Sequence, residues 1–176
     1  MPLKCIEGLD TRPTTDRIKE TLFNMLQPEI PGCRFLDLFG GSGAIGIEAL
    51  SRGADFAAFA ENNRKACQCI EENLAFTRFQ DRARVFFMDA LGALRVLEGE
   101  EPFDLIFLDP PYHKGHEEQS VSAIAEKGLL AEGGKIVVES AADTEFCVPA
   151  SFRVIKTKIY RMTKFTLLTR EQGECE

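Results

Sequence analysis

The sequence predicts one α/β domain, with a mostly parallel seven-stranded sheet, helices on both of its faces and an antiparallel hairpin at its C-terminal end. Two observations lead to this fold class. Short apolar runs alternate with helical patterns through most of the chain, and two strand-like runs then follow each other directly near its end. Nearly continuous apolar strands separated by helices are typical of a parallel sheet covered on both faces. A length of 176 residues fits a single domain, in which we expect residues 1–31 to form an N-terminal helical segment and residues 32–176 the core.

Apolar spacing and helix-stopping residues give the expected elements in chain order. Thr14 or Thr15 can cap a first helix that ends at about Leu26, because Pro28 and Pro31 follow it. Four further helices show apolar residues at helical spacing, and we expect them at Ala44–Arg52, Asn63–Phe76, Ala90–Leu97 and His116–Lys127. The expected strands are five apolar runs, Cys33–Phe39, Phe56–Ala60, Arg84–Met88, Phe103–Leu108 and Lys135–Glu139, followed by the hairpin strands Phe152–Ile159 and Met162–Thr169.

Composition excludes several classes of protein. The chain is 44% apolar and 28% charged, which argues against a disordered protein, and its net charge of −7 argues against one that coats nucleic acid non-specifically. No apolar run approaches the roughly 20 residues of a membrane span, and the N-terminus lacks the apolar core of a signal peptide. Six scattered cysteines without a CxxC pair and only two histidines argue against a metal site. We therefore expect a cytoplasmic protein with free thiols.

A glycine-rich turn follows the first expected strand. Gly41, Gly43 and Gly46 satisfy the pattern GxGxxG between a strand and a helix, which lets a ligand approach the helix N-terminus closely. Glu61 ends the next strand, where a carboxylate can accept hydrogen bonds from ribose hydroxyls. This arrangement favours an adenosine-containing cofactor over a purely structural turn, and both NAD(P) and S-adenosylmethionine (SAM) fit it. The acidic Asp37 before the glycines favours the cationic SAM, because it would repel a pyrophosphate.

The fourth expected strand ends in Asp109-Pro110-Pro111-Tyr112. Two prolines cannot continue a central strand, so they fix a rigid loop at the edge of the sheet where open α/β folds bind ligands. The Asp109 carboxylate and the Pro110 carbonyl could both accept hydrogen bonds from one exocyclic amino group, while Tyr112 stacks on its ring. The simpler interpretation is a stiff turn without a function. The preceding glycine-rich turn favours methyl transfer from SAM to that amino nitrogen.

This loop resembles motif IV of the amino-methyltransferases, and three segments together resemble the RsmD family of bacterial 16S rRNA guanine-N2 methyltransferases. These segments are residues 12–24 (RPTTDRIKETLFN), residues 36–54, with LDLFGGSG and EALSRGA, and residues 103–112 (FDLIFLDPPY). The resemblance covers nearly the whole chain. It departs from the family at Gly40, where alanine is usual, and at the hairpin turn Tyr160-Arg161-Met162-Thr163, where Gly-Asp-Thr is common.

The resemblance implies a class I SAM-methyltransferase fold, SAM as the cofactor, and 16S rRNA or the assembling small ribosomal subunit as the partner of a monomeric enzyme. It implies that Asp109, Pro110, Pro111 and Tyr112 hold the guanine, and that the segment from Arg12 to Arg17 borders the cleft. The residues that it implies around SAM are Asp37, Gly41 and Gly43 at the methionine part, Glu61 at the ribose, Asp89 and Ala90 at the adenine, and also Phe39 and Asn62.

Two other functions remain open from the residues. The same loop serves enzymes that methylate adenine N6 or cytosine N4 in DNA, although this chain has little room for a separate DNA-recognition domain. An NAD-binding oxidoreductase or a non-catalytic nucleotide-binding module would use the glycines but not the loop from Asp109 to Tyr112.

A basic segment offers a path for RNA. Ser151 to Arg170 contains six basic and no acidic residues. We predict a basic rim around the loop that begins at Asp109, with a solvated hairpin edge as the alternative. Its expected members are Arg12, Arg17, Lys114, Arg153, Lys156, Lys158, Arg161 and Lys164. Because successive strand residues point to opposite faces, Lys156 and Lys158 should share one face, and Arg153 and Arg161 the other.

Overall fold

The computed structural model describes residue 3 and residues 13–172, and of the helix that begins at Pro13 it describes the side chains from Asp16 onward. The helices are α1 (Pro13–Leu26), α2 (Ala44–Ser51), α3 (Arg64–Thr77), α4 (Ala90–Leu97) and α5 (His116–Lys127), with short 3₁₀ helices η1 (Gln27–Glu29) and η2 (Gln80–Arg82). The strands are β1 (Arg34–Asp37), β2 (Phe56–Glu61), β3 (Ala83–Phe87), β4 (Phe103–Leu108), β5 (Leu130–Ala141), β6 (Phe152–Tyr160) and β7 (Thr163–Arg170).

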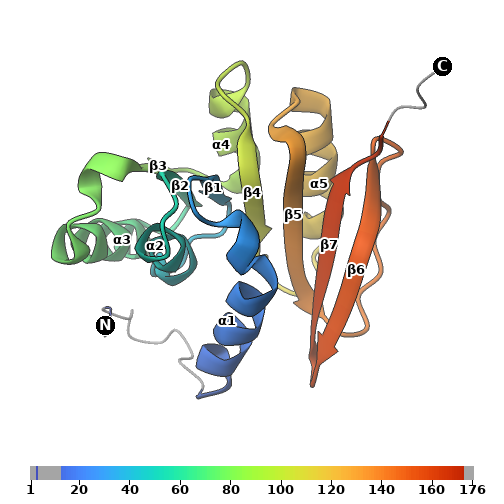
Figure 1. The fold of residues 1–176 in the computed structure, drawn as a ribbon, viewed down its shortest axis with the longest axis horizontal. Coiled ribbons are helices and arrows are strands. Elements are labelled where there is room, and N and C mark those ends of the chain that lie inside the picture. The colour runs from blue at the N-terminus through green and yellow to red at the C-terminus, as the bar shows by residue number, and fades with distance from the viewer. Residues whose placement is uncertain (1–2, 4–12, 173–176) are drawn as a thin grey trace.

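The seven strands form one sheet in the order β3-β2-β1-β4-β5-β7-β6. Strands β3, β2, β1, β4 and β5 are parallel, and β7 runs antiparallel to both β5 and β6. The expected mostly parallel sheet with a C-terminal antiparallel hairpin is therefore confirmed. Figure 1 shows α1 in front of the sheet and the hairpin at one edge of it.

Two apolar cores lie on opposite faces of this sheet. Leu36 of β1, Ile106 of β4 and Val138 of β5 pack with α4 and α5, whereas the adjacent Phe35, Phe107 and Val137 pack with α1, α2 and α3. This strict alternation follows from the two-residue repeat of a strand. It also decides on which face each polar residue at the carboxyl ends of these strands lies. We call the two sides the α1 face and the α5 face.

Candidate active site

Glycines shape the turn between β1 and α2. The N–H of Gly40 donates to the carbonyl of Ala60 on β2 at 2.9 Å, and Gly43 caps α2 with a φ of 83° that favours glycine. A Cβ on Gly46 would lie 2.3 Å from the Phe59 ring, so this glycine lets α2 pack closely on β2. The GxGxxG pattern therefore has the structural context expected of a cofactor-binding turn.

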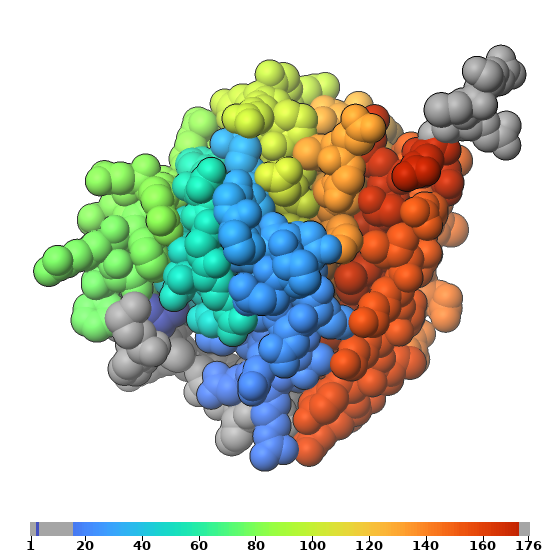
Figure 2. All heavy atoms as spheres, viewed as in Figure 1, coloured from blue at the N-terminus to red at the C-terminus, as the bar shows by residue number. Residues whose placement is uncertain are grey.

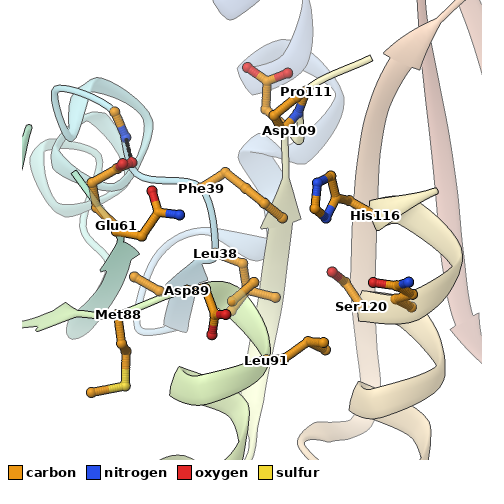
Figure 3. A pocket seen from close by; sticks show the side chains of 15 residues that line it. Leu38, Phe39, Glu61, Met88, Asp89, Leu91, Asp109, Pro111, His116 and Ser120 are labelled. Carbon is orange, nitrogen blue, oxygen red and sulfur yellow. Dashed lines mark hydrogen bonds between the residues drawn. The ribbon is translucent and has the colours of Figure 1, made fainter. Parts of the chain in front are cut away.

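A cavity of about 510 Å³ opens at the carboxyl ends of the parallel strands. Its volume is within the range of about 300–1,000 Å³ that is typical of small-molecule sites. Eight of the residues singled out from the sequence line it, namely Phe39, Gly41, Glu61, Asn62, Asp89, Ala90, Asp109 and Pro111. Figure 3 shows Glu61 on one side of this cavity, His116 and Ser120 of α5 on the other, and Asp109 at the top of the view.

Glu61 is held rigidly at the cavity wall. One carboxylate oxygen accepts the N–H of Gly41 at 2.9 Å (Figure 3). The other accepts the N–H of Asn63 at 3.1 Å. Each carboxylate oxygen has a second lone pair, so the side chain can still accept hydrogen bonds from a ligand. The glycine turn and Glu61 thus orient each other, a link that the sequence pattern does not reveal.

Asp89 has a structural task as well as a place in the cavity wall. Its carboxylate caps α4 by accepting the N–H of Gly92 at 2.7 Å. Ala90 follows as the first residue of α4. The pair therefore lies at a helix N-terminus that faces the cavity.

Seven lining residues were not singled out from the sequence: Leu38, Ala60, Met88, Leu91, His116, Gln119 and Ser120. Three of them could have been found, because His116, Gln119 and Ser120 are three and four positions apart on α5 and so share one side of that helix. The His116 ring lies edge-on to Phe39, with 6.0 Å between ring centroids. Helix α5 thus closes the cavity opposite Glu61 (Figure 3).

The loop after β4 places its four residues in different surroundings. Asp109 and Pro111 line the cavity, Pro110 is buried, and Tyr112 is 42% exposed with its ring edge-on to His113 at 6.3 Å. His113 has a φ of 61°, and its Nε2 lies 4.0 Å from the Asp143 carboxylate. The loop therefore presents an acidic side chain and an accessible aromatic ring at the mouth of the cavity.

Three carboxyl groups meet at this edge of the sheet. Asp37 pairs with Phe107 across β1 and β4, and because Leu108 pairs with Val138, Asp109 and Glu139 follow at neighbouring positions of β4 and β5. By strand alternation all three lie on the α1 face. Glu139 was not expected from the sequence, because a lone glutamate in a strand carries no motif.

Burial changes the proton affinity of these groups. Desolvation of the fully buried Asp37, with the nearby Asp109 and Glu61 charges, raises its pKa to about 7, although the N–H groups of Phe39 and Gly46 partly oppose this shift. Asp109 reaches solvent, but the protein atoms around its carboxyl group desolvate it and raise its pKa to about 6. Burial, Asp109 and Asp37 together raise the pKa of Glu139 to about 8. The cluster therefore retains protons near neutral pH in the free protein.

Asp37 and Gly43, which the family resemblance placed at the cofactor, do not line the cavity. The N–H groups of Phe39 and Gly46 lie near enough to Asp37 to lower its pKa, but neither carboxylate oxygen makes a hydrogen bond of good geometry among the described residues. A buried acceptor without a donor is costly, and native structures contain few of them. Asp37 is thus a buried acceptor beside the cavity, open to a ligand's donor.

The expected basic rim is only partly present. Arg17, Lys114, Lys156 and Lys158 are exposed, whereas Arg12 lies outside the described residues. Lys164 is buried and donates to the carbonyl of Thr144, so its expected place in the rim was wrong. Arg161 occupies the hairpin turn with a φ of 57° and lies over the Tyr160 ring.

The expected split of the hairpin cations was also wrong. A bulge between Val154 and Lys156 shifts the β6–β7 register, so that Arg153 pairs with Thr169 while Lys156 pairs with Leu167. Thr169 and Leu167 are two positions apart on β7. Arg153, Lys156 and Lys158 therefore all lie on the α1 face. Figure 2 shows the hairpin, in orange and red, beside α1.

Neither a metal cluster nor a membrane span is evident in the described part of the chain. No group of three or more His, Cys, Asp or Glu side chains there could hold a metal ion. No helix within residues 13–172 is long and apolar enough to cross a membrane. The cysteines within that range are free thiols, with Cys33, Cys67 and Cys69 buried and Cys147 exposed.

Comparisons with known proteins give one consistent result. A family model described as "Conserved hypothetical protein 95" matches residues 1–169. "Ribosomal RNA small subunit methyltransferase D" of Escherichia coli K12 is 39% identical over 178 aligned residues, which cover 100% of this chain and 87% of that protein. "Putative rRNA methyltransferase YlbH" of Bacillus subtilis is 43% identical over 144 residues, 81% of this chain and 78% of that protein.

A solved structure shows the same fold. "Putative methyltransferase yhhF from Escherichia coli" superposes with a TM-score of 0.85 at 38% identity, covering 96% of this chain and 91% of that one. The strand order and the helices on both faces agree with the class I methyltransferase fold that the motifs imply. The chain therefore belongs to the RsmD family of methyltransferases, which includes ribosomal RNA small subunit methyltransferase D of Escherichia coli.

Proposed function

We propose that the protein uses SAM to methylate an exocyclic amino nitrogen in 16S rRNA, and that the target is guanine N2. The observation that carries this proposal is the position of the Asp109–Tyr112 loop. It borders the cavity that Glu61 and Asp89 also line, so a cofactor and an amino group can meet at Asp109. The names of the relatives support small-subunit rRNA as the substrate.

The residues around the cavity fit SAM. Among the described residues no group donates a hydrogen bond of good geometry to the two buried carboxylate oxygens of Asp37, and an ammonium group would satisfy them. Glu61 is fixed by two backbone N–H groups and keeps lone pairs for ribose hydroxyls. Met88 and Leu91 supply apolar surface beside Asp89 and Ala90, which suits an adenine ring.

Bound SAM supplies the methyl group: a nitrogen–carbon bond forms, the sulfur–carbon bond breaks, and the nitrogen gives its proton to solvent. Asp109 and the Pro110 carbonyl accept hydrogen bonds from the amino group, which turns its lone pair toward the methyl donor. Tyr112 stacks on the base, a contact worth about 1–3 kcal/mol. The protein thus accelerates the reaction by proximity and alignment, without a covalent enzyme intermediate.

The RNA would approach over the α1 face. Arg153, Lys156 and Lys158 lie there on β6. Arg17 of α1 is two positions from Lys19, which pairs with Glu48 of α2 at 3.8 Å, so Arg17 points away from α2. Lys114, two positions after Tyr112, is a further exposed cation next to the loop. Such a reaction belongs to the cytoplasm, where ribosomal subunits assemble.

The role of Asp109 is tested with Asp109→Ala. We expect SAM affinity to stay within about twofold and methyl transfer to small ribosomal subunits to fall by at least ~10²-fold, because the amino group loses its alignment. Calorimetry gives the affinity, and labelled SAM gives the rate. If Asp109→Ala instead loses both folding stability and SAM affinity, the loop is a structural turn. Methyl transfer to DNA oligonucleotides but not to ribosomal subunits would overturn the proposal that rRNA is the substrate.

Glu61 tests the cofactor site. Glu61→Ala should weaken SAM binding by about 1.5–3 kcal/mol, the contribution of hydrogen bonds to a charged group. Glu126→Ala on the exposed side of α5 removes the same charge and should leave the affinity unchanged. Equal affinities of the Glu61→Ala variant and the unmodified protein, measured by calorimetry, would exclude Glu61 from the site.

A further inference from the structure

Glu139 is placed beside Asp109 although the proposed chemistry does not use it. Leu108 and Val138 are paired, and both chains continue by one residue to Asp109 and Glu139 at the carboxyl edge of the sheet. Val137, two positions before Glu139, packs on the α1 face, and so does Phe107, two positions before Asp109. The two carboxyl groups therefore lie side by side on one face.

No protein cation neutralises Glu139 within residues 16–172. Lys135 of the same strand pairs with Glu29, and Lys164, which lies across from Ser140, donates to the Thr144 carbonyl. Asp37 lies deeper on the same face and likewise lacks a donor for its two buried oxygens. The carboxyl groups of Glu139 and Asp37 can each accept hydrogen bonds, so this edge of the sheet can bind the hydrogen-bond donors of a ligand.

Guanine carries a donor at the position that Glu139 would face. On the Watson–Crick edge of guanine, the 2-amino group is followed by the ring N1–H. Beside the amino group of adenine or cytosine, the corresponding ring nitrogen has no hydrogen and is an acceptor. A carboxylate next to Asp109 therefore binds guanine and repels the other two bases.

We propose that Glu139 accepts the ring N1–H of the target guanine while Asp109 holds its amino group, and that Glu139 thereby selects guanine. This inference rests on the proposed function. The raised pKa of Glu139, about 8, agrees with a desolvated carboxyl group that lies beside Asp109 and Asp37. A site built to bond a substrate N–H discriminates strongly against an analogue without it, because a buried acceptor is then left unpaired.

The test compares two small ribosomal subunits, reconstituted with 16S rRNA that has guanine or 2,6-diaminopurine at the methylated position. Diaminopurine keeps the 2-amino group but has no hydrogen on N1. The assay runs above pH 8, where Glu139 is ionised even with its raised pKa of about 8. The unmodified protein should prefer guanine by ten- to a hundredfold in kcat/KM, roughly the value of a bond to a charged group.

Glu139→Gln should bring this ratio close to one, because an amide can donate to the bare N1 as well as accept from N1–H. Glu132→Gln, at an exposed position of the same strand, is the matched control and should keep the ratio. If Glu139→Gln does not fold, Glu139→Asp serves, and it should lower kcat/KM for guanine about tenfold with little change for diaminopurine.

A folded Glu139→Gln variant with normal SAM affinity and an unchanged ratio would overturn the role of Glu139 and leave the proposed function intact. If the unmodified protein binds SAM but methylates neither subunit, both proposals fail.

Discussion

At the scale of single residues, the raised pKa of Asp37 makes the stability of the protein depend on pH. In an unfolded chain an aspartate ionises near pH 4, whereas burial raises the pKa of Asp37 to about 7. The folded state therefore binds more protons between these values, and the free energy of unfolding should fall as the pH rises from about 4 to 7. Asp37→Asn removes this ionisation, so at pH 8 the variant should be more stable than the unmodified protein by about 1–4 kcal/mol, with little difference near pH 4. Urea unfolding of both proteins at both pH values checks this. An equal difference in the free energy of unfolding at pH 4 and pH 8 would contradict it.

The sequence indicates those site residues that belong to a local pattern. Glu61 ends β2 and Asp89 comes shortly after β3, so the apolar pattern of each strand locates them in the sequence. Both line the cavity together with Gly41 and Asp109. Glu139 could not be found in this way, because it becomes a neighbour of Asp109 only through the pairing of β4 with β5. Contacts between strands that are distant in the sequence have no local signal.

At the scale of elements, helical spacing and apolar runs located the α-helices and strands of the described residues to within a few residues, whereas the 3₁₀ helices η1 and η2 were not expected. Strand β5 is the largest departure, since it begins at Leu130 rather than Lys135. Gly133 and Gly134 interrupt its apolar pattern, so the first part does not resemble a strand in the sequence. The bulge in β6 was missed because nearly all of this edge strand is exposed, and no apolar alternation marks its register.

At the same scale, the helices α3 and α5 both end at a residue with left-handed backbone angles, which allows a direct comparison. Arg78 after α3 and Gly128 after α5 have nearly equal left-handed angles, with φ of 62° and 63°. A residue with a side chain loses roughly 1–2 kcal/mol of stability in this left-handed conformation. Glycine avoids this loss, but its unfolded state has a higher conformational entropy. Arg78→Gly should therefore raise the free energy of unfolding by about 0.5–1 kcal/mol, and Gly128→Ala should lower it by a similar amount. Urea denaturation of both variants tests this, and a loss of stability in Arg78→Gly would show that the arginine side chain contributes more than its strain costs.

At the scale of the whole molecule, we propose that this acidic protein contacts RNA through a group of cations on one face. The net charge is −7, yet Arg153, Lys156 and Lys158 share the α1 face at one edge of the sheet, where the ion pair of Arg153 with Glu171 is loose at 3.9 Å. Three cations that contact single-stranded phosphates would give a slope of log K against log salt near −2, since each contact releases about 0.7 counterions.

Reversing two of these charges tests the face. Lys156→Glu with Lys158→Glu should weaken binding to small ribosomal subunits and reduce the magnitude of the salt slope by about 1.4, because two of three phosphate contacts are lost. Arg84→Glu on β3, at the opposite edge of the sheet, with Arg95→Glu on α4, on the α5 face, makes the same change in net charge at two exposed positions and should leave the slope unchanged. Methyl transfer measured against salt concentration gives both slopes. If the two double variants behave alike, the effect comes from the net charge of the protein, and the RNA does not contact β6.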